Sequence, residues 1–510
     1  MTIDHKVRRH YGPAVLLAAC IARLWMMPLA SGFWADEMVT AFVVRHAAAD
    51  PTLRVAPRLG ESIYYVLPRA SVRLFGHSEW SYRLPSLVVL ILALWFFARI
   101  AARLFDREAA WFAVFCCLAL PSFNTQAADA RPYALGTCLV CAAVWYLLRW
   151  LDRGGWREAI LFAIAAALVI QVHLIFWPMY LLFALIAGSR RPSSGVQILA
   201  VCAALAASLA SMMAPALGLL REAGAHVVTD QPTPKDLISI LHLGPIAIVA
   251  GAAGVFAKLR GWKIARPSSV TLVAIAAWWL LDPLCLFAFS RITGHSVFVP
   301  RYMDVALPGI ALALTASVTF FLPARMWRPL SLAMGAGVLI FMGNWSRLWP
   351  EHENSDWRSA AQALRQLALP ADFAVLCPSP FVEARPPVWR PDYPIESFLY
   401  SNLLVYPMPG KLYPFPYDLS PDAERAASQL WSDTLSHSRG FAIFGIDRQV
   451  MPWREWFRAR PETRAWRDHK LGGFGNVSVV VFEALTSPPP SRESAASPPA
   501  APASSKAPDR

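Results

Sequence analysis

The sequence predicts an all-α polytopic membrane protein of about eleven transmembrane helices, followed by a small soluble α/β domain. Of its 510 residues, 56% are hydrophobic and only 16% are charged, and its mean hydropathy of +0.40 exceeds that of soluble globular chains. Long apolar segments recur up to residue 350, after which the composition becomes mixed. We therefore expect a transmembrane domain at 1–350, a soluble domain at 351–486 and a disordered, Pro/Ser/Ala-rich tail at 487–510.

Each apolar segment is taken as one span, because about 17 to 25 apolar residues cross a hydrocarbon core of roughly 30 Å. The segments cover residues 11–30, 80–98, 109–125, 132–149, 158–173, 174–189, 197–217, 237–257, 270–290, 302–322 and 329–347. The stretch 158–189 is open to two further interpretations, a single broken helix or a re-entrant pair. Asp282-Pro283 lies inside the ninth segment and predicts that this helix is broken there.

Basic residues indicate the orientation, since Lys and Arg concentrate in short cytoplasmic loops. They precede the first segment and recur in alternate connections, at Lys6, Arg8, Arg9, Arg99, Arg103, Arg107, Arg149, Arg153, Arg157, Arg190, Arg191, Lys258, Arg260, Lys263, Arg266, Arg325 and Arg328. The N-terminus is then cytoplasmic, and the chain after about residue 348 is exported. The net charge of +13 reflects this topology. The sequence offers no basic soluble face of the kind that would indicate nucleic-acid binding.

The exported parts contain further predicted elements. In the first exported loop, residues 31–79, two amphipathic segments at 38–48 and 62–75 predict juxtamembrane helices that cap a cavity between the spans. In the soluble domain we expect a helix at 357–367 and strands at 373–376 and 476–482. Cys377 is the one cysteine of this domain, so no disulfide is expected there, and no Cys or His spacing is typical of a zinc site.

The candidate site residues all lie at the exported ends of the spans. They are Asp36 and Glu37 after the first segment, Asp129 and Arg131 in the 124–131 loop, His173 between the fifth and sixth segments, and Arg301-Tyr302 at the start of the tenth. A carboxylate can accept a proton from an attacking hydroxyl, and guanidinium groups can bind a phosphate and stabilise it as a leaving group. This combination suits glycosyl transfer from a lipid phosphate.

Each of these residues also has a structural interpretation. Asp36 and Glu37 could serve only to favour the dipole of a helix that begins at Met38. Arg131 and Arg301 could extend along the membrane interface to reach water. His173 could be a hydrogen-bonded interface histidine rather than a ligand.

In its motifs the chain resembles the bacterial GT-C glycosyltransferases of the protein O-mannosyltransferase superfamily, which are glycosyltransferase family 39-like, and the lipid A aminoarabinose transferases. The motifs follow one another in order and cover roughly residues 10 to 375. They are Trp34-Ala35-Asp36-Glu37, Ile63-Tyr64-Tyr65, Arg73-Leu74-Phe75-Gly76, Ser78-Glu79, Arg83-Leu84-Pro85-Ser86, Ala130-Arg131-Pro132-Tyr133-Ala134-Leu135, Pro300-Arg301-Tyr302 with Leu307-Pro308, and Asp356-Trp357-Arg358. Many relatives have His-Pro-Pro or a similar turn where this chain has Glu61-Ser62-Ile63.

The resemblance implies a GT-C fold and a role for each site residue. Asp36 would be the catalytic base, Glu37 would orient the acceptor or the first loop, and Arg301, with Arg131 as a second contact, would bind the donor phosphate. The side chains expected to line the cavity are Tyr302, His173, Tyr133, Tyr64, Tyr65 and Asp129. No cofactor is implied with certainty, and a divalent metal stays open because related enzymes differ in metal use.

The expected activity is inverting transfer of a hexosyl or pentosyl group from a polyprenyl-phosphate donor, with undecaprenyl phosphate as the lipid. The enzyme would lie among the lipids of a bacterial cytoplasmic (inner) membrane and act on its exported face. The acceptor stays open between a glycolipid, a polysaccharide and a protein. Two other classes are kept: a lipid-linked saccharide transporter or flippase, which the absence of internal repeats disfavours, and a noncatalytic membrane scaffold.

Overall fold

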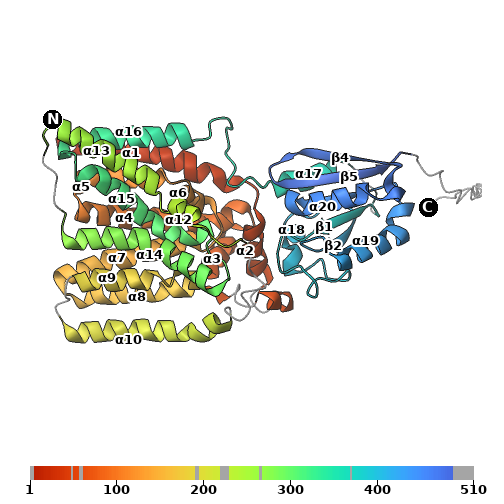
Figure 1. The fold of residues 1–510 in the computed structure, drawn as a ribbon, viewed down its shortest axis with the longest axis horizontal. Coiled ribbons are helices and arrows are strands. Elements are labelled where there is room, and N and C mark those ends of the chain that lie inside the picture. The colour runs from red at the N-terminus through yellow and green to blue at the C-terminus, as the bar shows by residue number, and fades with distance from the viewer. Residues whose placement is uncertain are drawn as a thin grey trace, which may run out of the picture.

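The computed structural model describes residues 5–46, 50–56, 61–189, 194–218, 229–262, 267–367, 370 and 372–485. A bundle of helices is joined at one end to a smaller domain built around a sheet (Figure 1). The tail at 487–510, predicted to be disordered, lies outside the described residues.

Within the described chain, one main helix lies in each of the eleven apolar segments. These helices are α1 (His5–Ile21), α4 (Glu79–Leu104), α5 (Arg107–Leu118), α7 (Tyr133–Arg153), α8 (Trp156–Val172), α9 (Met179–Ser189), α10 (Gly195–Ser211), α13 (Leu243–Leu259), α14 (Ser269–Thr293), α15 (Leu307–Thr319) and α16 (Trp327–Met342). Five described helical stretches are long and apolar enough to span a membrane alone, and a sixth is added if the bent pair of α12 and α13 counts as one span. The all-α membrane class is confirmed.

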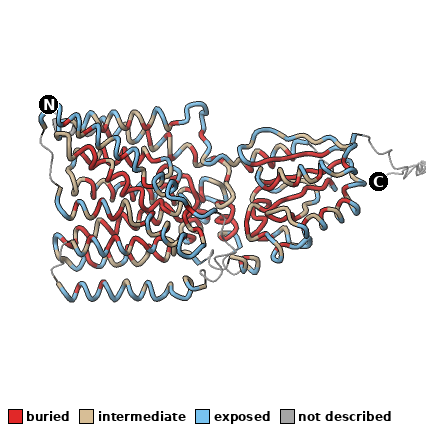
Figure 2. The backbone as a smooth tube through the Cα atoms, in the orientation of Figure 1, coloured by how far each residue is buried: buried red, intermediate tan, exposed pale blue. Residues whose placement is uncertain are grey.

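The bundle presents apolar side chains outward as well as inward. Trp95, Ile164, Leu199, Ile248 and Phe341 are all exposed on its helices, and Figure 2 shows buried residues along the inner sides of the bundle with exposed ones on its outer sides. In water such a surface would be unfavourable, but in lipid it costs nothing. The protein is therefore an integral membrane protein.

Two segments of the bundle bear on predictions from the sequence. The predicted break at Asp282-Pro283 is wrong, because α14 continues through both residues from Ser269 to Thr293. A proline removes one helix hydrogen bond, and neighbouring helices in a membrane bundle often compensate for it. The stretch 158–189 forms two helices, since α8 ends before His173 and the 3-10 helix η7 (Leu174–Phe176) leads to α9.

Short helices cover the end of the bundle next to the sheet domain. Helix α2 and helix α3 lie between the bundle and the sheet domain (Figure 1), as expected for the first loop. The short elements there are η1 (Ala22–Met26), η2 (Met27–Ala30), α2 (Ala35–His46), η3 (Pro51–Val55), η5 (Ile63–Tyr65), α3 (Val66–Phe75), α6 (Pro121–Thr125), η6 (Gln126–Ala128), α12 (Pro234–Ile240) and η8 (Pro300–Ala306), whereas η9 (Ala324–Met326) joins α15 to α16. Helix α2 starts three residues before the expected Met38, so that both acids fall in its first turn.

The domain that follows residue 350, called the exported domain after the side of the membrane that the basic loops predict for it, contains a five-stranded mixed sheet with the strand order β2-β1-β3-β5-β4. Its elements are α17 (Trp357–Gln366), β1 (Ala374–Pro378), η10 (Phe398–Tyr400), α18 (Ser401–Val405), β2 (Lys411–Phe415), α19 (Pro421–Asp433), η11 (Leu435–His437), β3 (Gly440–Ile446), α20 (Asp447–Arg458), η12 (Pro461–Thr463), β4 (Trp466–Phe474) and β5 (Val477–Ala484). Strands β2, β1 and β3 are parallel, and β5 and β4 are antiparallel to their neighbours. Central strand β1 is buried throughout, as its apolar sequence predicts.

The exported domain is anchored on the first loop of the bundle. The Tyr406 hydroxyl accepts a hydrogen bond from the Phe33 amide at 2.7 Å and donates one to Glu79 Oε1 at 3.1 Å. Phe398 packs edge-on against Phe42 of α2, with ring centroids 6.1 Å apart. Buried side chains of α2 and of the sheet belong to one apolar core, so the exported domain packs directly against the first loop of the bundle.

Candidate active site

The two acids of α2 have different surroundings although they are adjacent in sequence. The Asp36 side chain is 22% exposed, whereas the Glu37 side chain is 0% exposed. Consecutive residues on an α-helix point about 100° apart, because one turn takes 3.6 residues. Only Asp36 is therefore positioned to meet a ligand.

Glu37 forms a buried ion pair with Arg83 of α4. The Arg83 Nε donates to Oε1 at 2.7 Å and a terminal nitrogen donates to Oε2 at 2.5 Å. The amides of Ala130 and Trp34 donate to the same carboxylate, at 2.8 and 3.3 Å. Each Glu37 oxygen thus accepts two hydrogen bonds, and the side chain connects α2 to α4 and to the 124–131 loop.

Arg83 is a functional residue to which the sequence assigned no role. Its two terminal nitrogens also donate to the carbonyls of Leu29, Ser31 and Gly32 at 3.0, 2.6 and 2.9 Å, and so it fixes the chain that leads into α2. A signal was present, because an arginine within an apolar span is costly and is usually kept for a partner.

Asp36 lies between two arginines. Its Oδ2 is 3.1 Å from a terminal nitrogen of Arg301 in η8 and 4.0 Å from one of Arg131. Arg131 also donates to the Asp36 carbonyl at 3.1 Å. The Arg301 side chain is 39% exposed and its guanidinium lies over the rings of Trp34 and Tyr302, at 5.5 and 5.6 Å. These contacts hold a reachable guanidinium beside a reachable carboxylate.

Three rings cluster next to this group. His173 lies 6.4 Å from Tyr133 and 5.7 Å from Tyr302 between ring centroids. Burial, with Arg131 and Arg301 nearby, lowers the pKa of His173 to about 4, and its Nδ1 accepts a hydrogen bond from the Ile175 amide at 3.2 Å. His173 is therefore neutral at pH 7 and adds no positive charge for a phosphate.

A cavity of about 290 Å³ opens beside these residues, between the bundle and the exported domain. We call it the interface cavity. It is lined by Ala56, Glu61, Ser62, Tyr64, Tyr65, Arg131, Pro132, Ile170, Gln171, Val172, His173, Leu174, Met212, Pro215, Tyr302 and Glu383. The buried hydroxyls of Tyr64 and Tyr133 have no hydrogen-bond partner among the described residues. Such groups are available to a polar ligand.

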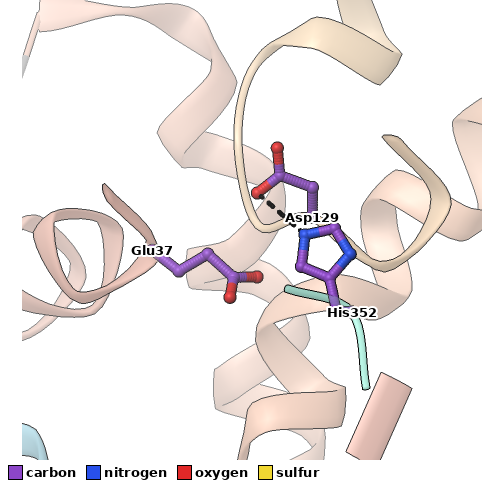
Figure 3. A group of neighbouring side chains, drawn as sticks. All are labelled: Glu37, Asp129 and His352. Atoms are coloured by element: carbon purple, nitrogen blue, oxygen red, sulfur yellow. Dashed lines mark ion pairs between the residues drawn. The ribbon is translucent and has the colours of Figure 1, made fainter. Parts of the chain in front are cut away.

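A second polar cluster lies behind Asp36 and contains Glu37, Asp129 and His352 (Figure 3). Their ligand atoms lie within 4.8 Å of one another, and His352 Nε2 is 3.8 Å from Asp129 Oδ1. Burial, and then the charge of Glu37, raises the pKa of Asp129 well above its usual range. Burial, and then Arg83, lowers the pKa of His352.

This cluster does not fit a divalent metal. Both Glu37 oxygens are fully engaged, and the Arg83 guanidinium would repel a cation bound to them. Asp129 is further engaged by the Trp34 indole, which donates to it at 3.1 Å. His352 gave no signal in the sequence, because it lies in the connector between the two domains and belongs to none of the motifs.

The predicted site residues therefore fall into two groups. Arg131, Tyr302, His173, Tyr64 and Tyr65 line the interface cavity, whereas Asp36, Arg301 and Tyr133 do not line it and contact residues that do. Glu37 and Asp129 are excluded from it and belong to the buried network behind α2. Glu383 of the exported domain lines the cavity and was not expected from the sequence.

Comparison with known proteins gives one family and several solved structures. Residues 63–215, fewer than half of the chain, match the dolichyl-phosphate-mannose-protein mannosyltransferase family. No curated protein matches the sequence. The structure is similar to apo ArnT from Cupriavidus metallidurans, with a TM-score of 0.54, 10% identity, and coverage of 92% of this chain and 97% of that chain.

The same ArnT bound to undecaprenyl phosphate matches with a TM-score of 0.52 and 14% identity, over 94% of this chain and 98% of that chain. Arabinosyltransferase EmbB from Mycobacterium smegmatis matches with a TM-score of only 0.38 and 16% identity, over 62% of this chain and 31% of that chain. At these identities the likeness to ArnT shows a common fold across nearly the whole of both chains.

Proposed function

We propose that this chain, which has the GT-C fold of membrane glycosyltransferases, transfers a sugar from a polyprenyl phosphate to a cell-envelope acceptor. The proposal depends above all on one observation, the partly exposed Asp36 carboxylate paired with Arg301 and Arg131 beside the interface cavity. The family match and the fold support a glycosyltransferase. Undecaprenyl phosphate, which one ArnT structure contains, is the lipid we propose, in the bacterial inner membrane.

In the proposed reaction the donor phosphate binds to Arg301 and Arg131. Two guanidinium groups can share its oxygens through charge-assisted hydrogen bonds and stabilise the charge that develops as it leaves. Because these groups pair with Asp36, the phosphate would compete with the carboxylate for them. Donor binding would thus release Asp36 for proton transfer.

The bond changes are those of a single displacement. The acceptor hydroxyl attacks the anomeric carbon, the bond from that carbon to the phosphate oxygen breaks, and the hydroxyl proton passes to Asp36. Attack opposite to the leaving phosphate inverts the anomeric configuration. Neutral His173, Tyr133 and Tyr302 form an aromatic wall beside the arginines, against which the sugar would bind without a charge conflict.

The transporter alternative loses its main support. A broken ninth span was the feature that favoured it, and α14 is unbroken. A scaffold would not need a carboxylate held beside a cavity by two arginines.

The test is transfer of labelled sugar from a panel of polyprenyl-phosphate sugars to an envelope extract. We expect Asp36→Asn and Arg301→Ala each to lower the rate by about a hundredfold or more, since one removes the base and the other a phosphate contact. Asp392→Asn and Arg390→Ala are matched controls, because both side chains are more than two-thirds exposed in the exported domain. Purification of each variant as a monodisperse folded protein checks that the chain is intact.

Full activity of Asp36→Asn would exclude the base assignment. Absence of transfer by the wild-type chain from every donor, with undecaprenyl phosphate still bound, would exclude the enzyme and favour transport or scaffolding.

A further inference from the structure

Trp34 contacts both the buried cluster of Figure 3 and the arginine pair of the site. Its indole Nε1 donates a hydrogen bond to Asp129 Oδ1 at 3.1 Å, and the centroid of its ring lies 5.5 Å from the guanidinium carbon of Arg301. The proposed reaction uses Arg301 but gives no part to Trp34 or Asp129. A buried carboxylate is costly and is usually kept for a partner, so the contact between Asp129 and Trp34 calls for an explanation.

The backbone and the side chain of Trp34 are both fixed. Its amide donates to Glu37 Oε2 at 3.3 Å, and its carbonyl accepts from the amides of Glu37 and Met38 at 3.1 and 3.3 Å. A tryptophan side chain has two rotatable torsions, so a hydrogen bond at the indole nitrogen determines where the ring lies once the backbone is held. Asp129 therefore sets the orientation of the Trp34 ring.

Among the described residues, one ion pair and two rings hold the guanidinium of Arg301. A terminal nitrogen is 3.1 Å from Asp36 Oδ2, and the Nε has no hydrogen-bond partner in the same part of the chain. The Tyr302 ring, at 5.6 Å, follows Arg301 directly and belongs to the same short helix η8. Trp34 is the ring that reaches Arg301 from a different element.

This ring contact matters most when the donor binds. In the proposed reaction the phosphate competes with Asp36 for Arg301, so the ion pair that holds the guanidinium is lost at that moment. A cation over a tryptophan face is attracted by the ring quadrupole, most strongly where water is excluded. The indole keeps the guanidinium in place while its anionic partner changes, and a group that is already in position loses less freedom on binding.

We propose that Trp34 and Asp129 are positioning residues for the donor, which deepens the proposed function and rests on it. Asp129 orients the indole of Trp34, and the indole holds the Arg301 guanidinium where the phosphate of the lipid binds. Both residues act through Arg301, and neither touches the reacting atoms.

The test is equilibrium binding of undecaprenyl phosphate to the purified full-length chain, in a double-mutant cycle of Trp34→Leu and Arg301→Ala. We expect Trp34→Leu to weaken binding roughly three- to thirtyfold in the wild-type background. Added to Arg301→Ala, it should change the affinity by less than about twofold, because the group that it positions is already absent. Trp349→Leu is the matched control, since that tryptophan is 64% exposed, and its affinity should equal that of the wild type.

The part of Asp129 is tested with a pair of variants. Asp129→Leu removes the acceptor of the indole hydrogen bond and should weaken binding, whereas Asp129→Asn retains an acceptor oxygen and should stay within about twofold of wild type. A loss of similar size in both would show that Asp129 does not act through this hydrogen bond, and would overturn its assignment.

An unchanged affinity in Trp34→Leu, with Arg301→Ala still weakened, would overturn this inference and leave the proposed function standing. An equal loss from Trp34→Leu with and without Arg301 would also overturn it, because Trp34 would then act independently of the arginine. Failure of the wild-type chain to bind undecaprenyl phosphate would overturn the proposed donor lipid itself, and this inference with it.

Discussion

At the residue scale, Asp36 and Glu37 have different surroundings although they are adjacent in sequence. Asp36 is partly exposed and borders a cavity through its arginines, while Glu37 is sealed against Arg83. Adjacent positions on a helix point in different directions, so one carboxylate can be presented to a ligand while its neighbour is buried. The two acids should therefore respond to mutation in different ways.

We expect Glu37→Gln to lower the free energy of unfolding by about 3 to 5 kcal/mol, because it leaves the Arg83 charge buried without its partner. Asp36→Asn should change it by less than about 1 kcal/mol, since that side chain is partly solvated. Denaturant titration in detergent micelles measures both. Equal stability of the two variants would contradict the assignment of Glu37 to the framework.

The pH dependence of stability should carry the signature of His173. Its pKa is about 4 in the folded protein because of burial and then Arg131 and Arg301, whereas an unfolded histidine titrates near 6.5. Between these values the unfolded chain binds more protons, so the free energy of unfolding should fall as the pH drops from about 6.5 to about 4 and level off below.

His173→Asn should lose this part of the pH dependence, as measured by thermal unfolding across the same range. His437→Asn changes an exposed histidine and should retain the wild-type profile. A His173→Asn profile that overlays the wild type would show that the histidine does not stay neutral on folding.

At the element scale, Arg23 joins the first span to the end of the last. It lies in η1 and is buried, and it donates to the carbonyls of Gly343, Leu348, Asn344 and Arg347 at 2.6, 2.6, 2.7 and 2.6 Å. The carbonyls after α16 have no partners within the helix, and one planar guanidinium satisfies several of them. The connector to the exported domain is thereby fixed to α1.

Arg23→Lys should destabilise the protein by about 2 kcal/mol or more, because an ammonium group cannot reach all four carbonyls. The control is Arg103→Lys, which alters a partly exposed ion pair with Asp152 and should cost less than about 1 kcal/mol. Denaturant titration of the two variants in the same detergent makes the comparison. Similar losses in both would show that the Arg23 contacts contribute little.

At the scale of the whole molecule, the exported domain packs against the bundle and lines part of the interface cavity. It shares an apolar core with α2, bonds to the first loop through Tyr406 and lines the interface cavity through Glu383. A cavity lined from both parts requires the domain and the arginine pair to lie on the same side of the membrane.

The distribution of basic loops predicts that this side is outside the cytoplasm. In a chain whose 8 native cysteines are replaced, Glu396→Cys should react with a membrane-impermeant maleimide in intact cells, and Arg153→Cys should react only after permeabilisation. Both positions are exposed, so accessibility on the folded surface is matched. The opposite labelling pattern would place the site in the cytoplasm.

Much of the fold can be predicted from local sequence. The positions of the apolar helices, the two helices of the first loop and the strands β1 and β5 follow from composition and periodicity over windows of ten to twenty residues. The prediction of a broken helix at Asp282-Pro283 failed for a non-local reason. Packing of α14 against its neighbours outweighed the local helix-breaking preference of the proline. The grouping of Asp36 with Arg301 and Arg131 was expected only from the order of the motifs.

The sequence alone determined the membrane class and the succession of helices, and it predicts the side of the membrane where the polar groups gather, because hydrophobic length and charge bias act locally along the chain. Tertiary structure decided which acid is partly exposed and which is buried. The partners that bury Glu37 lie 46 and 93 residues away, at Arg83 and Ala130, and Glu383 reaches the cavity only because its domain docks on the first loop. Burial and charge pairing depend on distances in space, and those are set only when the whole chain has folded.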